Sequence, residues 1–138
     1  MSEAFYELIA YRLKRSQEAL EEAIALAGIK HWNACVNRLY YACFYVVSAL
    51  LVFDNLSSSK HTGIRGLFNQ YYVRPQWVSK EIARIYNDLF ERRHEGDYVD
   101  FFEFQEAQVS VWIPLVEEFV TNIKSVIEQK KQETEKPS

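Results

Sequence analysis

Apolar residues recur at intervals of three and four along most of the chain, which is the periodicity of helices that bury one face. The first such segment follows Ser2, a residue type that caps helices, and reaches Gly28, where a helix can end. The second begins near Lys30 and is apolar around most of its circumference, which is typical of a central helix. No alternating strand pattern is present, so the sequence predicts an all-α protein.

Three further helices are expected after a polar break that follows the second helix. Ser59 is placed to cap a short third helix. Pro75 suits the first turn of a fourth helix, and Gly96 suits its C-terminal end. Asp100 and Glu103 form a capping-box pattern, which predicts that a fifth helix opens there.

The composition supports one folded domain without disulfide or metal cross-links. Hydrophobic residues make up 49% of the 138 residues and aromatic residues 15%, enough apolar surface to offset the ordering entropy. Cys35 and Cys43 lie eight positions apart in the central helix, or about 12 Å along its axis, too far for a disulfide. We therefore expect one domain of four long helices plus one short helix over residues 1–129, followed by a flexible tail over residues 130–138.

Net charge and hydropathy restrict the partners and the cellular location that we expect for the protein. The formal net charge of -3 argues against a protein that grips nucleic acid by bulk positive charge, and leaves a local basic patch as the alternative. The apolar run over residues 39–53 is shorter than the roughly 20 residues that a bilayer requires, so we expect a buried helix. The start of the chain lacks the pattern of a secretory leader, and the prediction is a cytoplasmic protein with no membrane contact.

The motifs in the sequence predict neither a metal site nor a cofactor site. Glu91 and His94 have the E-x-x-H spacing of a di-iron bundle, but such sites require this motif twice together with two further carboxylates, and it occurs here once. No phosphate-binding loop, Rossmann glycine pattern or nucleophile elbow is present.

Lys60 and His61 stand at the start of the short third helix. Cations at the positively polarised N-terminus of a helix are favourable where an anion such as phosphate is bound. The alternative is two solvated side chains on a loop.

A second polar cluster lies at the end of the fourth helix and contains Arg93, His94, Asp97 and Tyr98. A guanidinium there could balance the charge of a phosphodiester while a histidine moves protons. The alternative is an ordinary helix end, where cations complement the helix dipole.

Arg38, Tyr41 and Tyr45 form a polar strip on the central helix at intervals of three and four. An arginine in apolar surroundings usually has a carboxylate partner, and Asp97 is a candidate partner for Arg38. Arg12 lies on the apolar face of the first helix, and for it too the alternatives are a carboxylate partner or a bound ligand.

Three of these segments together resemble a small bacterial and archaeal branch of the HEPN family (higher eukaryotes and prokaryotes nucleotide-binding). They match the patterns R-x-Y-Y-A-x-F, K-H-x-G and R-x-x-x-D-Y. In this chain the three segments are Arg38-Leu39-Tyr40-Tyr41-Ala42-Cys43-Phe44, Lys60-His61-Thr62-Gly63 and Arg93-His94-Glu95-Gly96-Asp97-Tyr98. The resemblance runs from about residue 5 to residue 127.

The resemblance implies an antiparallel helical bundle that usually dimerises, with a polar groove near the dimer interface. Many members resemble toxins that cleave RNA without metal, often encoded beside a minimal nucleotidyltransferase that silences them. The active motif of the family is an arginine, four to six further residues and then a histidine. This chain departs from that motif, because His94 directly follows Arg93. His61, or a histidine from a second protomer, is the alternative source of the imidazole.

The sequence therefore predicts a homodimer that binds RNA or a nucleotide, or a nucleotidyltransferase antitoxin partner. The binding residues expected are Arg38, Tyr41, Lys60, His61, Asp97 and Tyr98. Arg93 and His94 are the catalytic candidates if the protein is a metal-independent endoribonuclease, a question that the sequence leaves open. The rival hypothesis is a non-catalytic structural or protein-interaction dimer, in which Asp97 pairs with Arg38 or Arg93 in a buried network.

Overall fold

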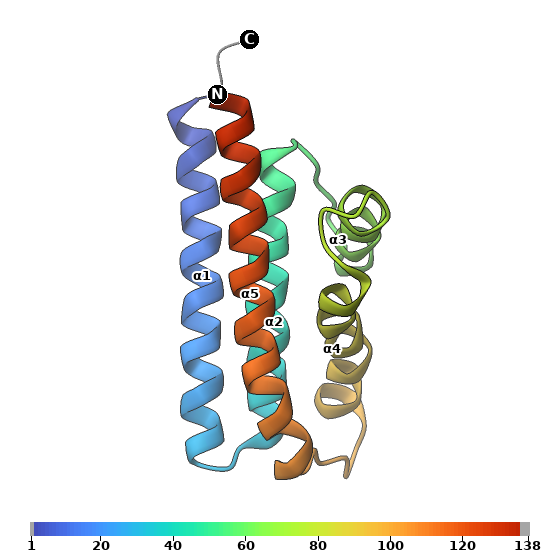
Figure 1. The fold of residues 1–138 in the computed structure, drawn as a ribbon. Coiled ribbons are helices and arrows are strands. Elements are labelled where there is room, and N and C mark those ends of the chain that lie inside the picture. The colour runs from blue at the N-terminus through green and yellow to red at the C-terminus, as the bar shows by residue number, and fades with distance from the viewer. Residues whose placement is uncertain (1, 136–138) are drawn as a thin grey trace.

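The computed structural model describes residues 2–135, and this part of the chain is helical with no strand. Consecutive long helices run in opposite directions (Figure 1). The elements are α1 (Glu3–Gly28), α2 (Trp32–Phe53), α3 (His61–Phe68), the π-helical turn η1 (Asn69–Val73), α4 (Lys80–Tyr98) and α5 (Glu106–Glu135). The predicted all-α bundle of four long helices and one short helix is confirmed.

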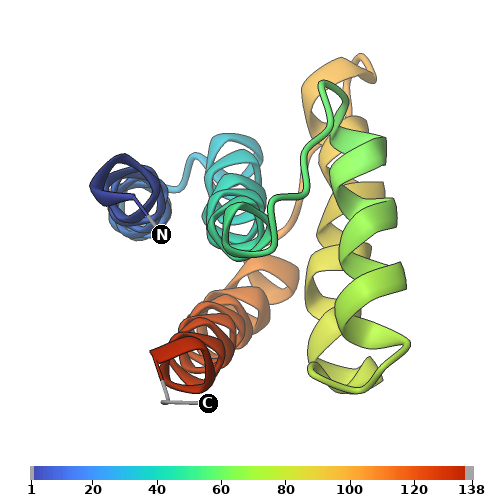
Figure 2. The same cartoon turned by 90° about the horizontal axis from the view of Figure 1, so that it is seen from above.

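The helix α2 occupies the centre of the bundle. Seen from above, α1 lies on one side of α2, α3 and α4 lie on the other, and α5 packs along a third (Figure 2). By length and composition α2 could cross a membrane, with a mean hydropathy of 1.5 over its most apolar window, but 67% of that window is buried inside the bundle. Its apolar character therefore serves the core, as the sequence predicted.

Two of the helix starts follow from capping. The Ser2 hydroxyl accepts a hydrogen bond from the Phe5 amide at 3.3 Å, which confirms the predicted start of α1. The Ser79 hydroxyl accepts from the Ile82 amide at 3.1 Å, and α4 begins only after it. The predicted start at Pro75 was wrong, because Gln76 has a φ of 71°, outside the helical range.

The start of α3 also differs from the prediction. Lys60, rather than Ser59, occupies the N-cap position of α3. The hydroxyl of Ser58 accepts a hydrogen bond from the Lys60 amide at 3.2 Å, which fixes the approach of the loop.

The junction between α4 and α5 departs most from the predicted boundaries. Gly96 does not end α4, which continues to Tyr98, and α5 opens at Glu106 instead of near Asp100. Asn33 of α2 explains the delay, because its Oδ1 accepts from the Phe104 amide at 2.9 Å and its Nδ2 donates to the Phe102 carbonyl at 2.8 Å. These bonds hold the connecting segment in a non-helical course across the end of the bundle.

The predicted tail begins too early. The helix α5 continues to Glu135, so residues 130–135 are helical, and residues 136–138 of the predicted tail lie outside the described part of the chain. Lys130 gives the physical reason: its Nζ lies 3.3 Å from Asp54 Oδ2 and 4.1 Å from the centre of the Trp77 ring. These contacts tie the last turns of α5 to the rest of the fold.

The core beneath the candidate site is aromatic. Tyr86 of α4 packs against Phe68 of α3 and Phe119 of α5, with ring centres 5.5 and 5.9 Å apart. Tyr40 of α2 lies against the same tyrosine and is fully buried. Cys35 and Cys43 are buried free thiols, as predicted. Tyr40 therefore joins the packed core to the polar side chains described next.

Candidate functional site

His61, the first residue of α3, stands at the centre of an aromatic cluster on α2. Its ring stacks on Phe44, with centres 4.3 Å apart and planes 24° apart. Its Nδ1 lies 2.9 Å from the hydroxyl oxygen of Tyr40, and the edge of Tyr41 meets the same ring at 5.8 Å. The loop before α3 thus delivers the imidazole to a fixed position against the central helix.

Arg93 of α4 covers the other side of this cluster. Its guanidinium carbon lies 4.3 Å from the centre of the Tyr40 ring and 5.8 Å from that of Tyr41, within the range of cation–π attraction. Within residues 2–135, no carboxylate lies within 4.0 Å of this half-buried guanidinium, and its Nε is buried without a hydrogen-bond partner. Arg93 therefore carries an uncompensated positive charge beside the imidazole.

The packing of α4 explains why Arg93 rather than its neighbour faces α2. Tyr86, Leu89 and Arg93 follow one another at intervals of three and four, which places them on one face of the helix. Tyr86 and Leu89 are fully buried. Arg93 is thus the polar end of a buried stripe, and it lies beside the aromatic cluster where the stripe leaves the core.

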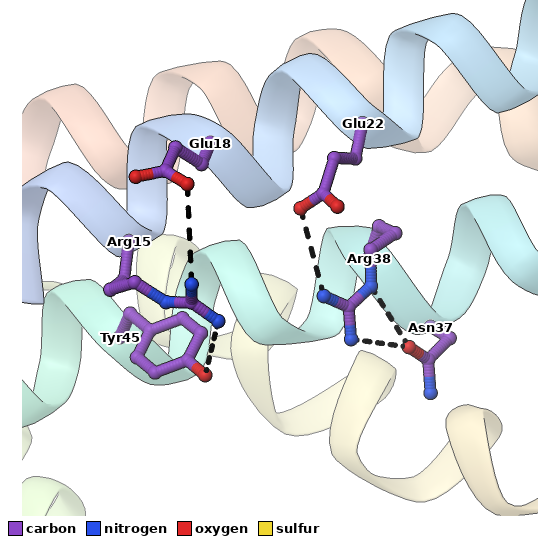
Figure 3. A network of polar contacts seen from close by, with 6 residues as sticks. All are labelled: Arg15, Glu18, Glu22, Asn37, Arg38 and Tyr45. Carbon is purple, nitrogen blue, oxygen red and sulfur yellow. Dashed lines mark hydrogen bonds and ion pairs between the residues drawn. The ribbon is translucent and has the colours of Figure 1, made fainter.

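Arg38 and Tyr41 extend this cluster toward α1. The Arg38 guanidinium lies 4.8 Å from the centre of the Tyr41 ring. It also lies 3.7 Å from Glu22 of α1 (Figure 3). Its Nε and Nη2 donate to Asn37 Oδ1 at 3.1 and 2.8 Å. This arginine is partly neutralised by its neighbours, which distinguishes it from Arg93.

Asp97 does not play the structural part that the sequence suggested. It is exposed, and its Oδ2 accepts from Asn37 Nδ2 at 2.9 Å. Neither Arg38 nor Arg93 pairs with it, so the predicted ion pair was wrong. Arg38 turns instead to Glu22 on the helix that packs beside it. An exposed Asp97 counts against the rival hypothesis of a buried network that fixes the helices.

The other predicted residues lie around the cluster rather than in it. His94 and Tyr98 are exposed on α4, where their rings contact each other at 5.0 Å. Consecutive helical residues point in directions about 100° apart, so His94 does not share the face of Arg93. Lys60 is exposed at the N-cap of α3. The structure therefore brings together Arg93, Tyr41 and His61, with Arg38 beside them.

Sequence reasoning missed Tyr40 and Phe44 as site residues. Both belong to the R-x-Y-Y-A-x-F segment, and they lie four positions apart on one face of α2. That spacing could have indicated that the two side chains belong to one site. Which tyrosine of the pair faces α3 depends on the rotation of α2 in the bundle, and the sequence of a helix that is apolar nearly all round does not reveal it.

Gly63, the glycine of the K-H-x-G segment, has a packing role. A Cβ at this position would collide with the hydroxyl of Ser58 and would stand 2.7 Å from its Cβ. The absence of a side chain therefore lets the loop before α3 fold back onto the helix. This close approach sets the position of Lys60 and His61.

The described residues contain no set of side chains placed to bind a metal ion. Glu91, the acidic member of the E-x-x-H segment, is 2.7 Å from Arg65 on α3. No group of three or more histidine, cysteine, aspartate or glutamate side chains is arranged to hold an ion within residues 2–135.

The surroundings of His61 favour its neutral form. Burial, and then the positive charge of Arg93, lower the pKa of His61 below its ordinary value of about 6.5. The unfolded chain therefore binds this proton more readily than the folded chain does. The resulting contribution to folding stability is complete above pH 6.5 and is lost as the pH falls through the lowered pKa.

Replacing Arg93 with glutamine is expected to raise the pKa of His61, because a nearby positive charge disfavours the imidazolium. The pKa should stay below about 6.5, since the burial of the ring persists. An NMR titration of the His61 Hε1 signal measures the change. Arg74→Gln removes an exposed positive charge and serves as the control. An equal rise in both variants would exclude a local effect of Arg93.

The fold and the site define a small all-helical protein in which arginine, tyrosine and histidine side chains converge. The chain belongs to the HEPN domain family, whose model matches residues 9–126. It is 41% identical to a UPF0332 protein of Thermotoga maritima over 126 residues, which cover 91% of this chain and 96% of that one. A protein of Methanocaldococcus jannaschii named as a "putative toxin" is 30% identical over 123 residues, which cover 89% of this chain and 91% of the relative.

Proposed function

We propose that the site formed by Arg93, Tyr40, Tyr41 and His61 binds a phosphodiester of RNA or a nucleotide. The observation that carries the proposal is the half-buried guanidinium of Arg93, which has no carboxylate within 4.0 Å in the described part of the chain. An unpaired charge beside a low-dielectric core is costly, and an anionic ligand would compensate it. The aromatic rings next to it are surfaces on which bases can stack.

The hydrogen bond between Tyr40 and His61 bears on whether this site binds or cleaves. If the Tyr40 hydroxyl donates to Nδ1, the neutral imidazole carries its proton on Nε2 and can donate to a phosphate oxygen. If Tyr40 accepts instead, Nε2 has a free lone pair and can take the proton of a ribose hydroxyl. Nδ1 is the hydrogen-bond partner of the buried Tyr40 hydroxyl within residues 2–135. Because a buried hydroxyl must donate to some acceptor, we favour the first arrangement, and with it binding over cleavage.

Cleavage is the second candidate function, supported by the presence of Arg93 and a neutral imidazole in one site. The ribose 2′ oxygen would attack the phosphorus while His61 accepts its proton, the bond to the 5′ oxygen would break, and water would protonate that leaving oxygen. Arg93 would stabilise the charge on the pentavalent phosphate. This reaction would need no metal.

The biological setting that we propose is a cytoplasmic toxin–antitoxin pair. Two Methanocaldococcus jannaschii relatives bear the name "putative toxin". A homodimer and a nucleotidyltransferase antitoxin partner are the arrangement implied by the family resemblance, and both remain predictions for this chain.

A comparison of two histidine variants tests the proposed site. We expect the protein to bind labelled single-stranded RNA in the presence of EDTA at fixed salt. His61→Asn should weaken binding about two- to tenfold, the usual range for one hydrogen bond. His94→Asn should bind as the wild type does. Gel analysis of the same samples shows whether the RNA is cut: intact RNA supports binding alone, and cleavage that depends on His61 would establish the second function. A loss of binding in His94→Asn but not in His61→Asn would refute the site.

A further inference from the structure

Arg12 of α1 shares with Arg93 a property that the other half-buried arginines lack. Its Nη1 donates to the carbonyl of Ser48 at 3.1 Å. Within residues 2–135, however, no carboxylate approaches Arg12 within 4.0 Å. The half-buried arginines that do have a glutamate within this distance are Arg15, Arg38, Arg65 and Arg92. Arg12 and Arg93 are thus the two half-buried guanidinium groups without a carboxylate in the described chain.

A cavity of about 190 Å³ opens beside Arg12. Its other polar lining residues are Ser57 and Ser58, from the loop that leads to α3, and Tyr45 and Ser48 of α2. A guanidinium with serine and tyrosine hydroxyls is a set of donors suited to phosphate oxygens. The residues lining the cavity include no carboxylate that would repel an anion.

This cavity adjoins the site of the proposed function. Phe44 forms one of its walls, and the His61 ring stacks on the same phenylalanine at 4.3 Å. Phe44 therefore stands between the cavity and the imidazole. The two uncompensated arginines lie at either end of this aromatic cluster, Arg93 over Tyr40 and Arg12 in the cavity beyond Phe44.

The aromatic surface continues along α2 past the cavity. Tyr45 follows Tyr41 by one helical turn, and their rings are 5.9 Å apart. Arg15 lies 5.3 Å from the centre of the Tyr45 ring, and its Nη2 donates to the Tyr45 hydroxyl at 3.4 Å (Figure 3). Figure 3 shows this pair on the same α1–α2 surface as Arg38. Alternating arginines and tyrosines along one surface are typical of proteins that bind single strands by stacking.

We propose that the cavity at Arg12 holds a second phosphate of a single-stranded RNA whose first phosphate lies at Arg93. The inference rests on the proposed function, and it adds a second phosphate subsite and a path for the strand along α2. A single strand fits better than a duplex, because aromatic rings can stack on its unpaired bases, whereas a duplex keeps its bases stacked on one another. A mononucleotide would reach one of the two subsites, and an oligonucleotide would reach both.

The test compares a labelled hexauridylate with uridine monophosphate, using fluorescence anisotropy for the first and its displacement by the second. Arg12→Gln should weaken hexauridylate binding about tenfold, the effect of one charged hydrogen-bonding contact. The slope of the logarithm of affinity against the logarithm of salt concentration should fall by about 0.7, the value for one phosphate of a single strand. The affinity for uridine monophosphate at the Arg93 subsite should not change.

Two substitutions of Ser57 test the same cavity without a change in the folded core. Ser57 is exposed on the loop at the cavity, so its replacement leaves the core intact. Ser57→Asp places a negative charge beside Arg12 and should weaken hexauridylate binding more than Ser57→Asn does, because both substitutions remove the hydroxyl and asparagine has the shape of aspartate without the charge. Arg74→Gln again controls for the loss of one exposed positive charge.

The outcomes separate the two proposals. If Arg12→Gln and Ser57→Asp bind hexauridylate like the wild type while Arg93→Gln loses it, the second subsite is wrong and the proposed function stands. If Arg12→Gln weakens uridine monophosphate as much as hexauridylate, Arg12 belongs to the first subsite and the inference also fails. If the wild type binds neither probe, the proposed function fails, and the subsite fails with it.

Discussion

Arg93→Gln is expected to lower the affinity for single-stranded RNA about ten- to a hundredfold. The estimate follows from the loss of a charged hydrogen bond, worth about 1.5–3 kcal/mol, because each 1.4 kcal/mol is a factor of ten in affinity. We expect a large loss of affinity because the Arg93 guanidinium is half-buried over Tyr40 and its Nε has no hydrogen-bond partner in the described residues. Fluorescence anisotropy at one fixed salt concentration measures the change.

The same variant separates a binding role from a structural one. A guanidinium that holds the fold together through a buried ion pair would leave its partner unpaired when removed, at a cost of about 3–5 kcal/mol. Arg93 has no such partner in residues 2–135. We therefore expect Arg93→Gln to unfold at about the same temperature as the wild type. Weak binding with unchanged stability supports the proposal. Wild-type affinity, or a large loss of stability, would contradict it.

Arg93→Lys provides a finer comparison. Lysine keeps the positive charge but lacks the planar guanidinium that stacks on an aromatic ring and donates two parallel hydrogen bonds. It should bind RNA more tightly than Arg93→Gln and less tightly than the wild type. Such an order would show that both charge and shape of Arg93 contribute.

Much of the fold was predictable because periodicity reports burial directly. The stripe of apolar residues on α1 and the nearly continuous apolar surface of α2 are consequences of packing in a bundle, and the structure confirms both. The boundaries around the α4–α5 junction were predicted less well. Gly96 and the Asp100–Glu103 pattern are local signals, whereas the actual course of that segment depends on hydrogen bonds to Asn33, more than sixty residues earlier in the chain.

The site was predictable to the extent that its residues belong to matched segments. Tyr41, His61 and Arg93 converge, although they come from different helices. The choice between Arg93 and His94 required the orientation of α4, and the buried stripe through Tyr86 and Leu89 contained that information. The interaction of Arg38 with Glu22 was beyond prediction, because it depends on how α1 packs against α2.

Gly96→Ala is expected to destabilise the protein, although alanine is the better helix former. A Cβ at Gly96 would stand 2.6 Å from Cε2 of Phe104. The ring cannot easily move, because Phe104 is 1% exposed and packs against Phe102 and Trp112 at 4.8 and 5.6 Å. Overpacking of this kind costs about 1–3 kcal/mol. The absence of a side chain at Gly96 therefore permits the close approach of a ring, whereas the sequence alone predicted that this glycine ends the helix.

Gly66→Ala is the matched control, because Gly66 lies inside α3 and a Cβ there would meet nothing within 4 Å. Helix propensity favours alanine by about 1 kcal/mol at both positions, so Gly66→Ala should be the more stable variant. The difference between the two unfolding free energies isolates the collision with Phe104 and should be about 1–3 kcal/mol, measured by urea denaturation. If the two substitutions had equal effects, Phe104 would have room to yield, and the position of Gly96 inside α4 would need another explanation.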